Sequence, residues 1–322
     1  MTIATRPPAD GSLRSAAWRA AFAAVPREAF VSPVGRGEEP EPSPVLTAMC
    51  EALDVPDGAG VLEVGTGTGY GAALLSQRYG ADRVVSLDAD SCTVAAARTR
   101  LARAGYTPRL MTGETSAGCP EFAPFGGLLA SCGTVTRVPV AWPEQVLPGG
   151  TLVAALGFGL VALTIAPDGS AAGRFLPVLT PEGPRAETSV RSYIPALLVP
   201  LGTQADVELA ADMAAEVPRF LGGLLQPDVY ELALIDADGR RVFGLVHPDT
   251  GSWARVAPRD DGTARIQYDG PRDLWAERAP ALAAWAEAGR PGPEAYGLTV
   301  TAEGAHRLWL GAPDGPGWDL MY

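Results

Sequence analysis

The segment 61-VLEVGTGTGY-70 places four strand-forming positions directly before three glycines at alternate positions. Val61, Leu62 and Val64 favour a buried strand, and the glycines leave the turn that follows without side chains. A turn of this kind lets another group approach the main chain closely. The segment therefore predicts a strand that ends in a glycine-rich loop at the carboxyl edge of a parallel sheet.

Two common nucleotide-binding patterns do not fit this loop. A phosphate-binding loop reads GxxxxGK followed by Ser or Thr, and no lysine follows these glycines. A dinucleotide-binding loop reads GxGxxG, and Tyr70 occupies the position of its third glycine. The pattern GxGxG after an acid-bearing strand is typical of class I S-adenosylmethionine-dependent methyltransferases. A nicotinamide-dependent oxidoreductase is the weaker alternative.

Acidic residues at the ends of three expected strands complete a candidate cofactor site. We expect Glu63 to orient amides or a cationic amine, Asp88 to accept both ribose hydroxyls, and Glu114 to meet the adenine amino group. Two other interpretations stay open, in which Asp88 caps the next helix and Glu114 is a solvated loop acid. The expected cofactor-binding residues are Glu63, Gly65, Thr66, Gly67, Thr68, Gly69, Asp88, Ala89, Gly113, Glu114 and Thr115.

Composition and charge narrow the class of protein. The chain has 322 residues, of which 47% are hydrophobic and 19% charged, so two globular domains can each bury a core. Its formal net charge of −12 disfavours nucleic acid and anionic membranes as partners. The four cysteines have no CxxC pairing, so we expect neither a disulfide framework nor a bound metal. The N-terminus lacks the apolar core of a signal peptide, and the longest apolar run, 151–166, contains two glycines. We therefore expect a soluble cytoplasmic protein.

The rhythm of strands and helices changes along the chain. From Val61 onward, short apolar strands alternate with helices, which predicts a Rossmann-like α/β domain with a parallel sheet. Turns of the type Asp-Gly or Glu-Gly follow at 167, 237, 260, 302 and 313 and predict hairpins. Helices are expected at "QADVELAADMAAE" and "PRDLWAERAPALAAWAEAG". We therefore expect a catalytic domain over 1–182 and a strand-rich α+β domain over 183–322, with the boundary at a pair of prolines.

Several blocks of sequence resemble protein-L-isoaspartate O-methyltransferases. In chain order they include "VPREAFV", "VLTAMCEALDV", "VLEVGTGTGYGAALLSQRYG", "GETSAG" and "VPVAWPEQVLPGG", and the resemblance covers Trp18 to Leu179. It implies S-adenosylmethionine as methyl donor and a catalytic role for Ser43, the one serine in "PEPSPV", near the substrate carboxyl. Two departures stand out: the register of Ser43 differs by a residue or two, and "PFGG" replaces the usual "PFD" before the fourth strand.

The C-terminal segments "GSWARV" and "RPGPEAYGLTVTAEGAHRLWLGAPDGPGW" resemble a subgroup that accompanies ATP-grasp peptide maturases. This resemblance implies that the substrate is a modified precursor peptide of the graspetide type. One aspartate of that peptide would be methylated and would then close to an aspartimide, with the C-terminal domain recognising the substrate. Two alternatives stay open: a general isoaspartyl repair enzyme, and a non-catalytic peptide-binding module.

Overall fold

The computed structural model describes residues 13–30, 43–56, 58–180, 193–198, 203–208, 213–236 and 238–320. The chain divides into two compact units. Unit 1 combines residues up to Thr180 with Pro293–Asp319, and unit 2 holds Pro181–Gly292 and the last three residues. The loop expected over 32–44 lies mostly outside the described residues.

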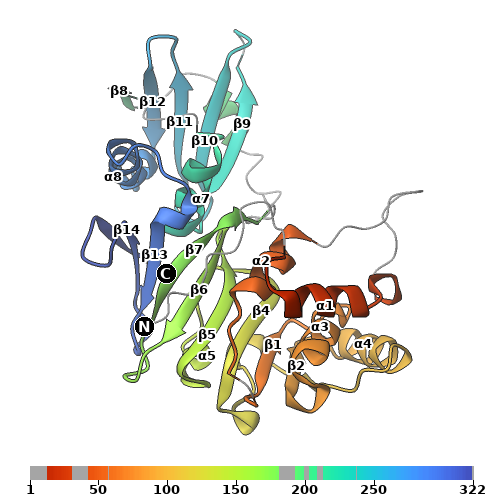
Figure 1. Cartoon of the computed structure of the whole chain (residues 1–322). Coiled ribbons are helices and arrows are strands. Elements are labelled where there is room, and N and C mark those ends of the chain that lie inside the picture. The colour runs from red at the N-terminus through yellow and green to blue at the C-terminus, as the bar shows by residue number, and fades with distance from the viewer. Residues whose placement is uncertain are drawn as a thin grey trace. The chain divides into compact units, whose positions relative to one another are not determined.

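Unit 1 is built on a ten-stranded sheet with the order β15-β14-β13-β7-β6-β5-β4-β1-β2-β3 (Figure 1). Neighbouring strands from β5 through β4, β1 and β2 to β3 pair in parallel, and β5 to β7, β13 and β14 pair antiparallel. The strands are β1 Val61–Val64, β2 Val84–Asp88, β3 Arg109–Thr112, β4 Phe125–Val135, β5 Val146–Leu156, β6 Gly159–Ile165, β7 Ala171–Leu179, β13 Tyr296–Val300, β14 His306–Leu310 and β15 Gly317–Leu320. This arrangement confirms the expected Rossmann-like α/β sheet.

The helices of unit 1 precede β1 or lie between strands of the sheet. They are α1 Ala16–Ala24, α2 Pro44–Ala52, α3 Tyr70–Tyr79, α4 Ser91–Arg103 and α5 Ala141–Glu144, with short 3-10 turns at Arg27–Ala29, Ala81–Arg83, Thr115–Ala117, Pro120–Phe122 and Pro293–Ala295. Side chains from α1 to α4 join strand residues such as Val61 and Val153 in one buried cluster. All four residues of β1 are buried, which holds the strand before the glycine loop rigidly in the sheet.

The end of the chain corrects the predicted domain boundary. The sequence pattern assigns Pro293–Asp319 to the second domain, but β13 pairs with β7 and extends the sheet of unit 1. His306 on β14 is buried, and its Nε2 accepts the N–H of Val138 at 3.0 Å. Burial lowers the pKa of His306, which agrees with a neutral ring held between strands. The turn at Ala302 predicts the hairpin, but turn chemistry carries no information about which sheet edge the hairpin joins.

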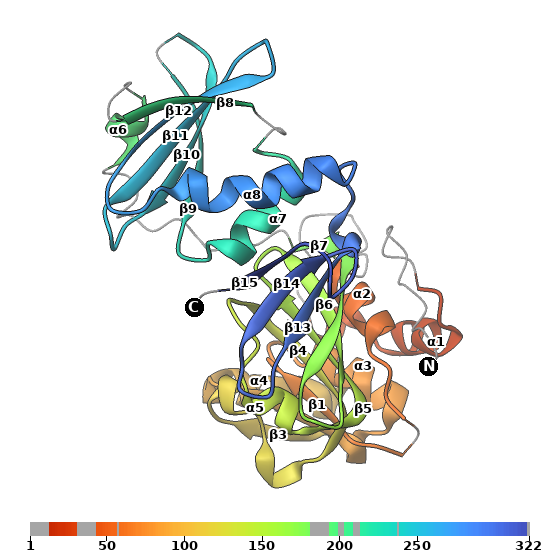
Figure 2. The same ribbon diagram turned by 90° about the vertical axis from the view of Figure 1, so that its left-hand side faces the viewer.

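Unit 2 is a five-stranded antiparallel sheet with the order β8-β12-β11-β10-β9, accompanied by helices (Figure 2). Its elements are α6 Ile194–Leu198, β8 Thr203–Glu208, α7 Glu216–Leu225, β9 Tyr230–Ile235, β10 Arg241–His247, β11 Ser252–Pro258, β12 Thr263–Asp269 and α8 Leu274–Glu287. The hairpins expected at 237 and 260 connect β9 to β10 and β11 to β12. The helix expected within "PRDLWAERAPALAAWAEAG" is confirmed as α8.

The helix predicted at "QADVELAADMAAE" is wrong. Residues 203–208 form β8, which pairs with β12 so that Ala205 lies opposite Ile266 and Val207 opposite Ala264. The helix begins only at Glu216, where apolar residues recur at helical spacing. Its buried residues include Val217, Phe220, Leu221 and Leu224. The alternation on β8 consists of Ala205 and Val207 only, and the alanine-rich stretch that follows the strand favours a helix.

The two faces of the unit 2 sheet differ in what covers them. A Cβ on Gly244 would lie 2.5 Å from Leu197 of α6, so this face of β10 packs on α6. Leu197 forms a small buried cluster with Val246 and Trp253 there. On the opposite face, Glu231 of β9 pairs with Arg278 of α8. Across the described residues no helix is long and apolar enough to cross a membrane, and no group of His, Cys, Asp and Glu is placed to hold a metal ion.

Candidate active site

The carboxyl ends of β1, β2 and β3 bring the predicted cofactor residues to one edge of the sheet. The three strands are adjacent and parallel, with Val64 paired to Leu87 and Asp88 paired to Thr112. The acids predicted from the sequence therefore follow one another along this edge, as the spacing of the motifs requires.

The three glycines after β1 serve three different purposes. Gly65 has a φ of +102°, and a Cβ there would lie 2.4 Å from the backbone nitrogen of Cys132 on β4. Gly69 begins α3 with a φ of +90° and packs closely on Leu101 of α4. Gly67 has a φ of +50°, but a Cβ on it would meet no atom of the described residues within 4 Å. Gly67 is therefore the point at which bare backbone faces open space that a ligand can occupy.

Glu63 lies at the centre of a buried hydrogen-bonded group. It is 1% exposed, and its Oε2 accepts the hydroxyl of Ser86 at 2.6 Å. The Ser86 hydroxyl also lies 2.7 Å from that of Thr66. Burial raises the pKa of Glu63 to about 8, although hydrogen bonds from Ser86 and Ser131 oppose the shift. A cation beside Glu63 would favour its ionised form, so the group suits an ammonium or sulfonium ligand.

Asp88 links the glycine loop to the end of β2. Its Oδ2 accepts the N–H of Gly67 at 3.0 Å, and its Oδ1 accepts the N–H of Asp90 at 3.1 Å. The helix cap is provided by Asp90 instead, whose Oδ1 accepts the N–H of Cys92 at 2.9 Å. The alternative in which Asp88 itself caps α4 is therefore wrong, and its carboxylate is directed to the loop.

The residues after β3 form the third part of the edge. The N–H of Gly113 donates to the carbonyl of Asp88 at 3.0 Å, which ties the ends of β2 and β3 together. Glu114 is exposed and its Oε1 accepts the hydroxyl of Ser116 at 3.1 Å. The carbonyl of Thr115 accepts the indole N–H of Trp142 at 2.9 Å. The carboxylate of Glu114 thus lies at the surface, next to a backbone fixed by other contacts.

The remaining predicted residues differ in what their side chains can offer. The hydroxyl of Thr66 is buried beside Ser86, so it supports Glu63 from inside the sheet. Thr68 is exposed, and its hydroxyl oxygen accepts the N–H of Tyr70 at 3.4 Å. Ala89 is exposed directly after Asp88.

Ser43 stands at the start of α2. It is exposed, and its side chain makes no capping hydrogen bond. None of the hydrogen bonds that join Glu63, Gly67 and Asp88 to their partners includes Ser43. The catalytic role of Ser43 therefore stays a prediction.

Two residues of this site are missing from the predicted set. Ser86 interrupts the otherwise apolar strand "RVVSLD", and a polar residue inside a buried strand is a usable signal that something polar lies beside it. Gly71 lies in the first turn of α3, where a Cβ would be 2.0 Å from Oε1 of Glu63. Gly67 and Gly71 therefore have different roles. Gly67 faces open space, whereas Gly71 leaves room for the carboxyl of Glu63.

Known proteins of one family resemble this chain. The family described as protein-L-isoaspartate(D-aspartate) O-methyltransferase (PCMT) matches residues 9–162. A protein-L-isoaspartate O-methyltransferase of Methylorubrum populi is 37% identical over 202 residues, which cover 59% of this chain and 88% of that protein. One of Thermococcus onnurineus is 33% identical over 163 residues, which cover 46% of this chain and 73% of that protein. A solved structure named protein-L-isoaspartate O-methyltransferase shares the fold, with a TM-score of 0.52 at 20% identity, over 92% of this chain and 96% of that chain.

Proposed function

Because the chain belongs to the protein-L-isoaspartate O-methyltransferase family, and is an S-adenosylmethionine-dependent carboxyl O-methyltransferase, we propose that it methylates an aspartate side chain of a ribosomally made, cross-linked peptide. The ester then leads to an aspartimide. Family membership removes two alternatives, the oxidoreductase and the non-catalytic binding module. The proposal that the substrate is a cross-linked peptide is supported by features of unit 2.

The edge of unit 1 has the chemistry that the donor requires. Its ionisable side chains are carboxyls, and no lysine or arginine occurs over positions 64–77. The first cation after β1 is Arg78, in the last turn of α3. A loop with carboxyls and no cation in its own sequence suits a ligand with a sulfonium, an amine and ribose hydroxyls better than it suits a phosphate.

Within this site we assign each residue a task. Gly67 offers backbone to the donor in open space, Asp88 offers carboxylate oxygens to its ribose, and Glu63 offers a buried negative charge on ionisation. When bound, S-adenosylmethionine supplies a sulfonium-activated methyl group that the substrate carboxylate takes, leaving a neutral thioether. The protein has to hold the reacting atoms in line and exclude water from them.

A general base is not needed for this reaction. An aspartate side chain has an ordinary pKa of about 3.9, so it is already ionised at neutral pH. The site has therefore only to avoid protonating the substrate. Ser43 at the start of α2 remains the candidate for contact with that carboxylate.

The second step is chemistry of the peptide. The backbone amide nitrogen that follows the esterified aspartate attacks the ester carbonyl and forms a new C–N bond. The bond from carbon to the methoxy oxygen breaks, and the amide proton leaves with that oxygen as methanol. The result is a five-membered imide, which requires only the ester and a favourable peptide conformation.

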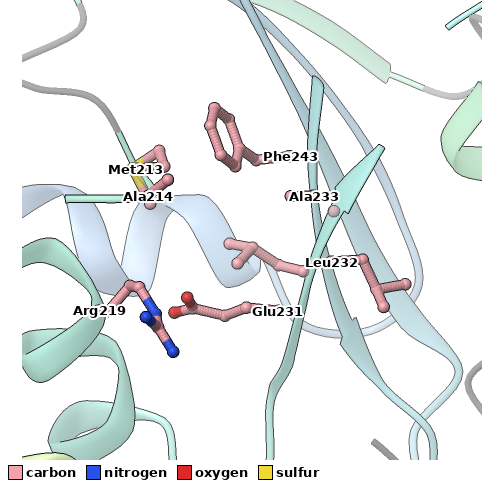
Figure 3. Close-up of a pocket in the computed structure, with 9 residues that line it drawn as sticks. Met213, Ala214, Arg219, Glu231, Leu232, Ala233 and Phe243 are labelled. Atoms are coloured by element: carbon pink, nitrogen blue, oxygen red, sulfur yellow. The ribbon is translucent and has the colours of Figure 1, made fainter. Parts of the chain in front are cut away.

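Unit 2 supports the idea of a selected peptide. It has its own sheet and buried residues, and it interrupts unit 1 between β7 and β13. A pocket of about 270 Å³ lies between the start of α7 and strands β9 and β10 (Figure 3). Phe243 and Met213 lie at one end of it, and Arg219 and Glu231 point toward one another at the other. A pocket with an apolar end and a charged end suits one amphipathic side chain of a peptide.

General repair of isoaspartyl proteins is the second candidate. It is favoured by the names of the relatives in Methylorubrum populi and Thermococcus onnurineus. Such an enzyme acts on many flexible substrates, so it gains little from a selective pocket.

One assay separates the two candidates. Methyl transfer from S-adenosylmethionine is measured to an isoaspartyl tripeptide and to a side-chain cross-linked precursor peptide that contains aspartate. We expect turnover of the cross-linked peptide and imide formation, with little turnover of the tripeptide. Robust turnover of the tripeptide together with no reaction of the cross-linked peptide would replace our proposal by repair.

A further inference from the structure

A second pocket of unit 2 is lined mainly by arginines. It encloses about 230 Å³, and five arginines line it together with two aspartates. The whole chain has 25 cationic residues, all of them arginine, against 37 acids. One fifth of the positive charge therefore gathers at one pocket of an acidic protein, which marks it as a place for negative charge. Its arginines are Arg240, Arg241, Arg255, Arg259 and Arg265.

Strand register places most of these side chains on the face of the unit 2 sheet against which α6 packs. Gly244 faces Leu197 of α6, and Gly244 pairs with Arg255, which pairs in turn with Gln267. Residues directly opposite one another on neighbouring strands share a face. Arg265 lies two residues before Gln267 and so points to the same side. The pocket is therefore on the opposite face from the one that carries Glu231.

The pocket contains buried donors without acceptors. Arg255 is 6% exposed and Gln267 is fully buried. Arg255 gives one nitrogen to Asp236 and another to the Oε1 of Gln267, at 3.0 and 2.9 Å. Its Nε and the Nε2 of Gln267 have no hydrogen-bond partner among the described residues. Two buried N–H groups that lack acceptors are costly, and an incoming acceptor would offset that cost.

The carboxylates nearby do not saturate these cations. Asp206 accepts from both Arg259 and Arg265, at 2.9 and 3.1 Å, and Asp236 accepts from Arg255. Arg240 is exposed, and no carboxylate in the described part of the chain forms an ion pair with its guanidinium. The pocket thus keeps a net positive charge and spare donors.

The spread of the cations indicates the kind of ligand. They lie on or next to three neighbouring strands, β10, β11 and β12, and strands in a sheet are about 4.8 Å apart. The charges therefore extend over roughly 10 Å, which exceeds the reach of one small anion. Guanidinium groups bind carboxylates well because the planar fork can form two parallel hydrogen bonds.

We propose that this arginine pocket binds a carboxylate-rich segment of the peptide substrate. The proposal rests on the proposed function, because it gives the selected peptide an acidic recognition segment apart from the methylated residue. Binding at this pocket needs neither the methyl donor nor the glycine loop.

The test is a binding measurement on the full chain without donor. The probe is a fluorescein-labelled hexa-aspartate, compared with hexa-asparagine of the same length. We expect the wild-type protein to bind hexa-aspartate and not hexa-asparagine. Arg240→Glu combined with Arg265→Gln should raise the Kd at least tenfold, because it removes two cations and adds one anion at the pocket.

A matched variant controls for overall charge. Arg83→Glu combined with Arg103→Gln makes the same charge change at exposed sites of unit 1, and its Kd should equal that of the wild type. Gln267→Glu is a second test inside the pocket. It keeps an acceptor for Arg255 but places a fixed carboxylate there, so it should also weaken binding at least tenfold.

Three results would overturn the proposal. The first is no binding of hexa-aspartate at millimolar concentration, and the second is equal weakening by the pocket and control variants. The third is complete displacement of hexa-aspartate by inorganic phosphate at a concentration of a few millimolar. That result would make the pocket a site for small anions. Since no methyl transfer is involved, these results are independent of whether the methylation assay succeeds.

Discussion

The carboxyl edge of unit 1 and the arginine pocket of unit 2 handle buried polar groups in opposite ways. At the edge, the Glu63 carboxyl accepts hydrogen bonds from the hydroxyls of Ser86 and Ser131. In the pocket, Arg255 and Gln267 each keep a buried N–H without an acceptor in the described chain. A satisfied acidic site suits a cationic ligand, whereas an unsatisfied basic site suits an anionic one. On our proposals, the methyl donor binds at the acidic edge of unit 1, and an acidic segment of the peptide binds at the arginine pocket of unit 2.

The largest effect is expected at the glycine that the sheet itself requires. Gly65→Ala would place a Cβ 2.4 Å from the backbone of Cys132 at a φ of +102°. We expect a loss of more than about 4 kcal/mol in the free energy of unfolding. Gly67→Ala, with open space around the new Cβ, should cost only about 1 kcal/mol. Urea denaturation of both variants measures the difference, and equal losses would contradict the separate roles of the two glycines.

A large effect is also expected from pH at the acidic edge. The folded pKa of Glu63, about 8, lies above its ordinary value of 4.5. Between these two pH values the folded chain holds a proton that the unfolded chain has lost, so its stability falls as pH rises. The fall should be on the order of 5 kcal/mol, because the two pKa values differ by about 3.5.

Glu63→Gln isolates that contribution, because glutamine has the same shape and does not titrate. The wild type minus variant difference in unfolding free energy should decrease from pH 4.5 to pH 8 and stay level above it. A difference that is constant over this range would show that Glu63 is ionised in the folded protein.

A medium effect is expected from Ser86, which joins Glu63 to Thr66. Ser86→Ala leaves both partners buried without this hydroxyl, and should cost about 2 kcal/mol. Ser76→Ala is the matched control, since the Ser76 hydroxyl is also buried but bonds only to the carbonyl of Ala72 within α3. Thermal unfolding should separate the two variants, and a neutral Ser86→Ala would show that Glu63 does not depend on a polar network.

The smallest effect is expected in the arginine pocket, and its sign is opposite. Gln267→Glu supplies a carboxylate beside Arg255 and removes an unpaired donor, so it should stabilise the protein by about 1 kcal/mol. Gln204→Glu, at the position opposite on β8, makes the same charge change on an exposed side chain and should be neutral. Destabilisation by Gln267→Glu alone would indicate that the pocket is not short of acceptors.

Much of the fold could be predicted because its signals are local. The strand before Gly65, the alternation that follows it and the turns at Gly169 and Gly262 each depend on a few neighbouring residues. The return of β13 to β7 could not be predicted, because pairing between distant strands is decided by packing and leaves no local pattern. The same holds for β8, because its apolar residues Ala205 and Val207 are too few to distinguish a strand from a helix.

The candidate site also contains residues that the sequence predicts and residues that it does not. Sequence motifs indicate Glu63, Gly67 and Asp88 because each follows directly from the strand–loop pattern. They do not reveal that Ser86 holds Glu63, since the two residues are 23 positions apart and meet only when β1 and β2 pair. The arginine pocket could not be predicted either, because its residues come from three strands whose register is set by the fold.

We expect the edge formed by Gly67 and Asp88 to hold the methyl donor, and the proposed methyl transfer depends on it. Calorimetry with S-adenosylhomocysteine tests this on three proteins: the wild type, Asp88→Ala and Asp82→Ala, whose exposed carboxylate precedes the opposite end of β2. The wild type and Asp82→Ala should bind alike, and Asp88→Ala should bind at least tenfold more weakly, because the ribose loses its acceptor. Equal affinity of all three proteins, or no binding by the wild type, would contradict this assignment.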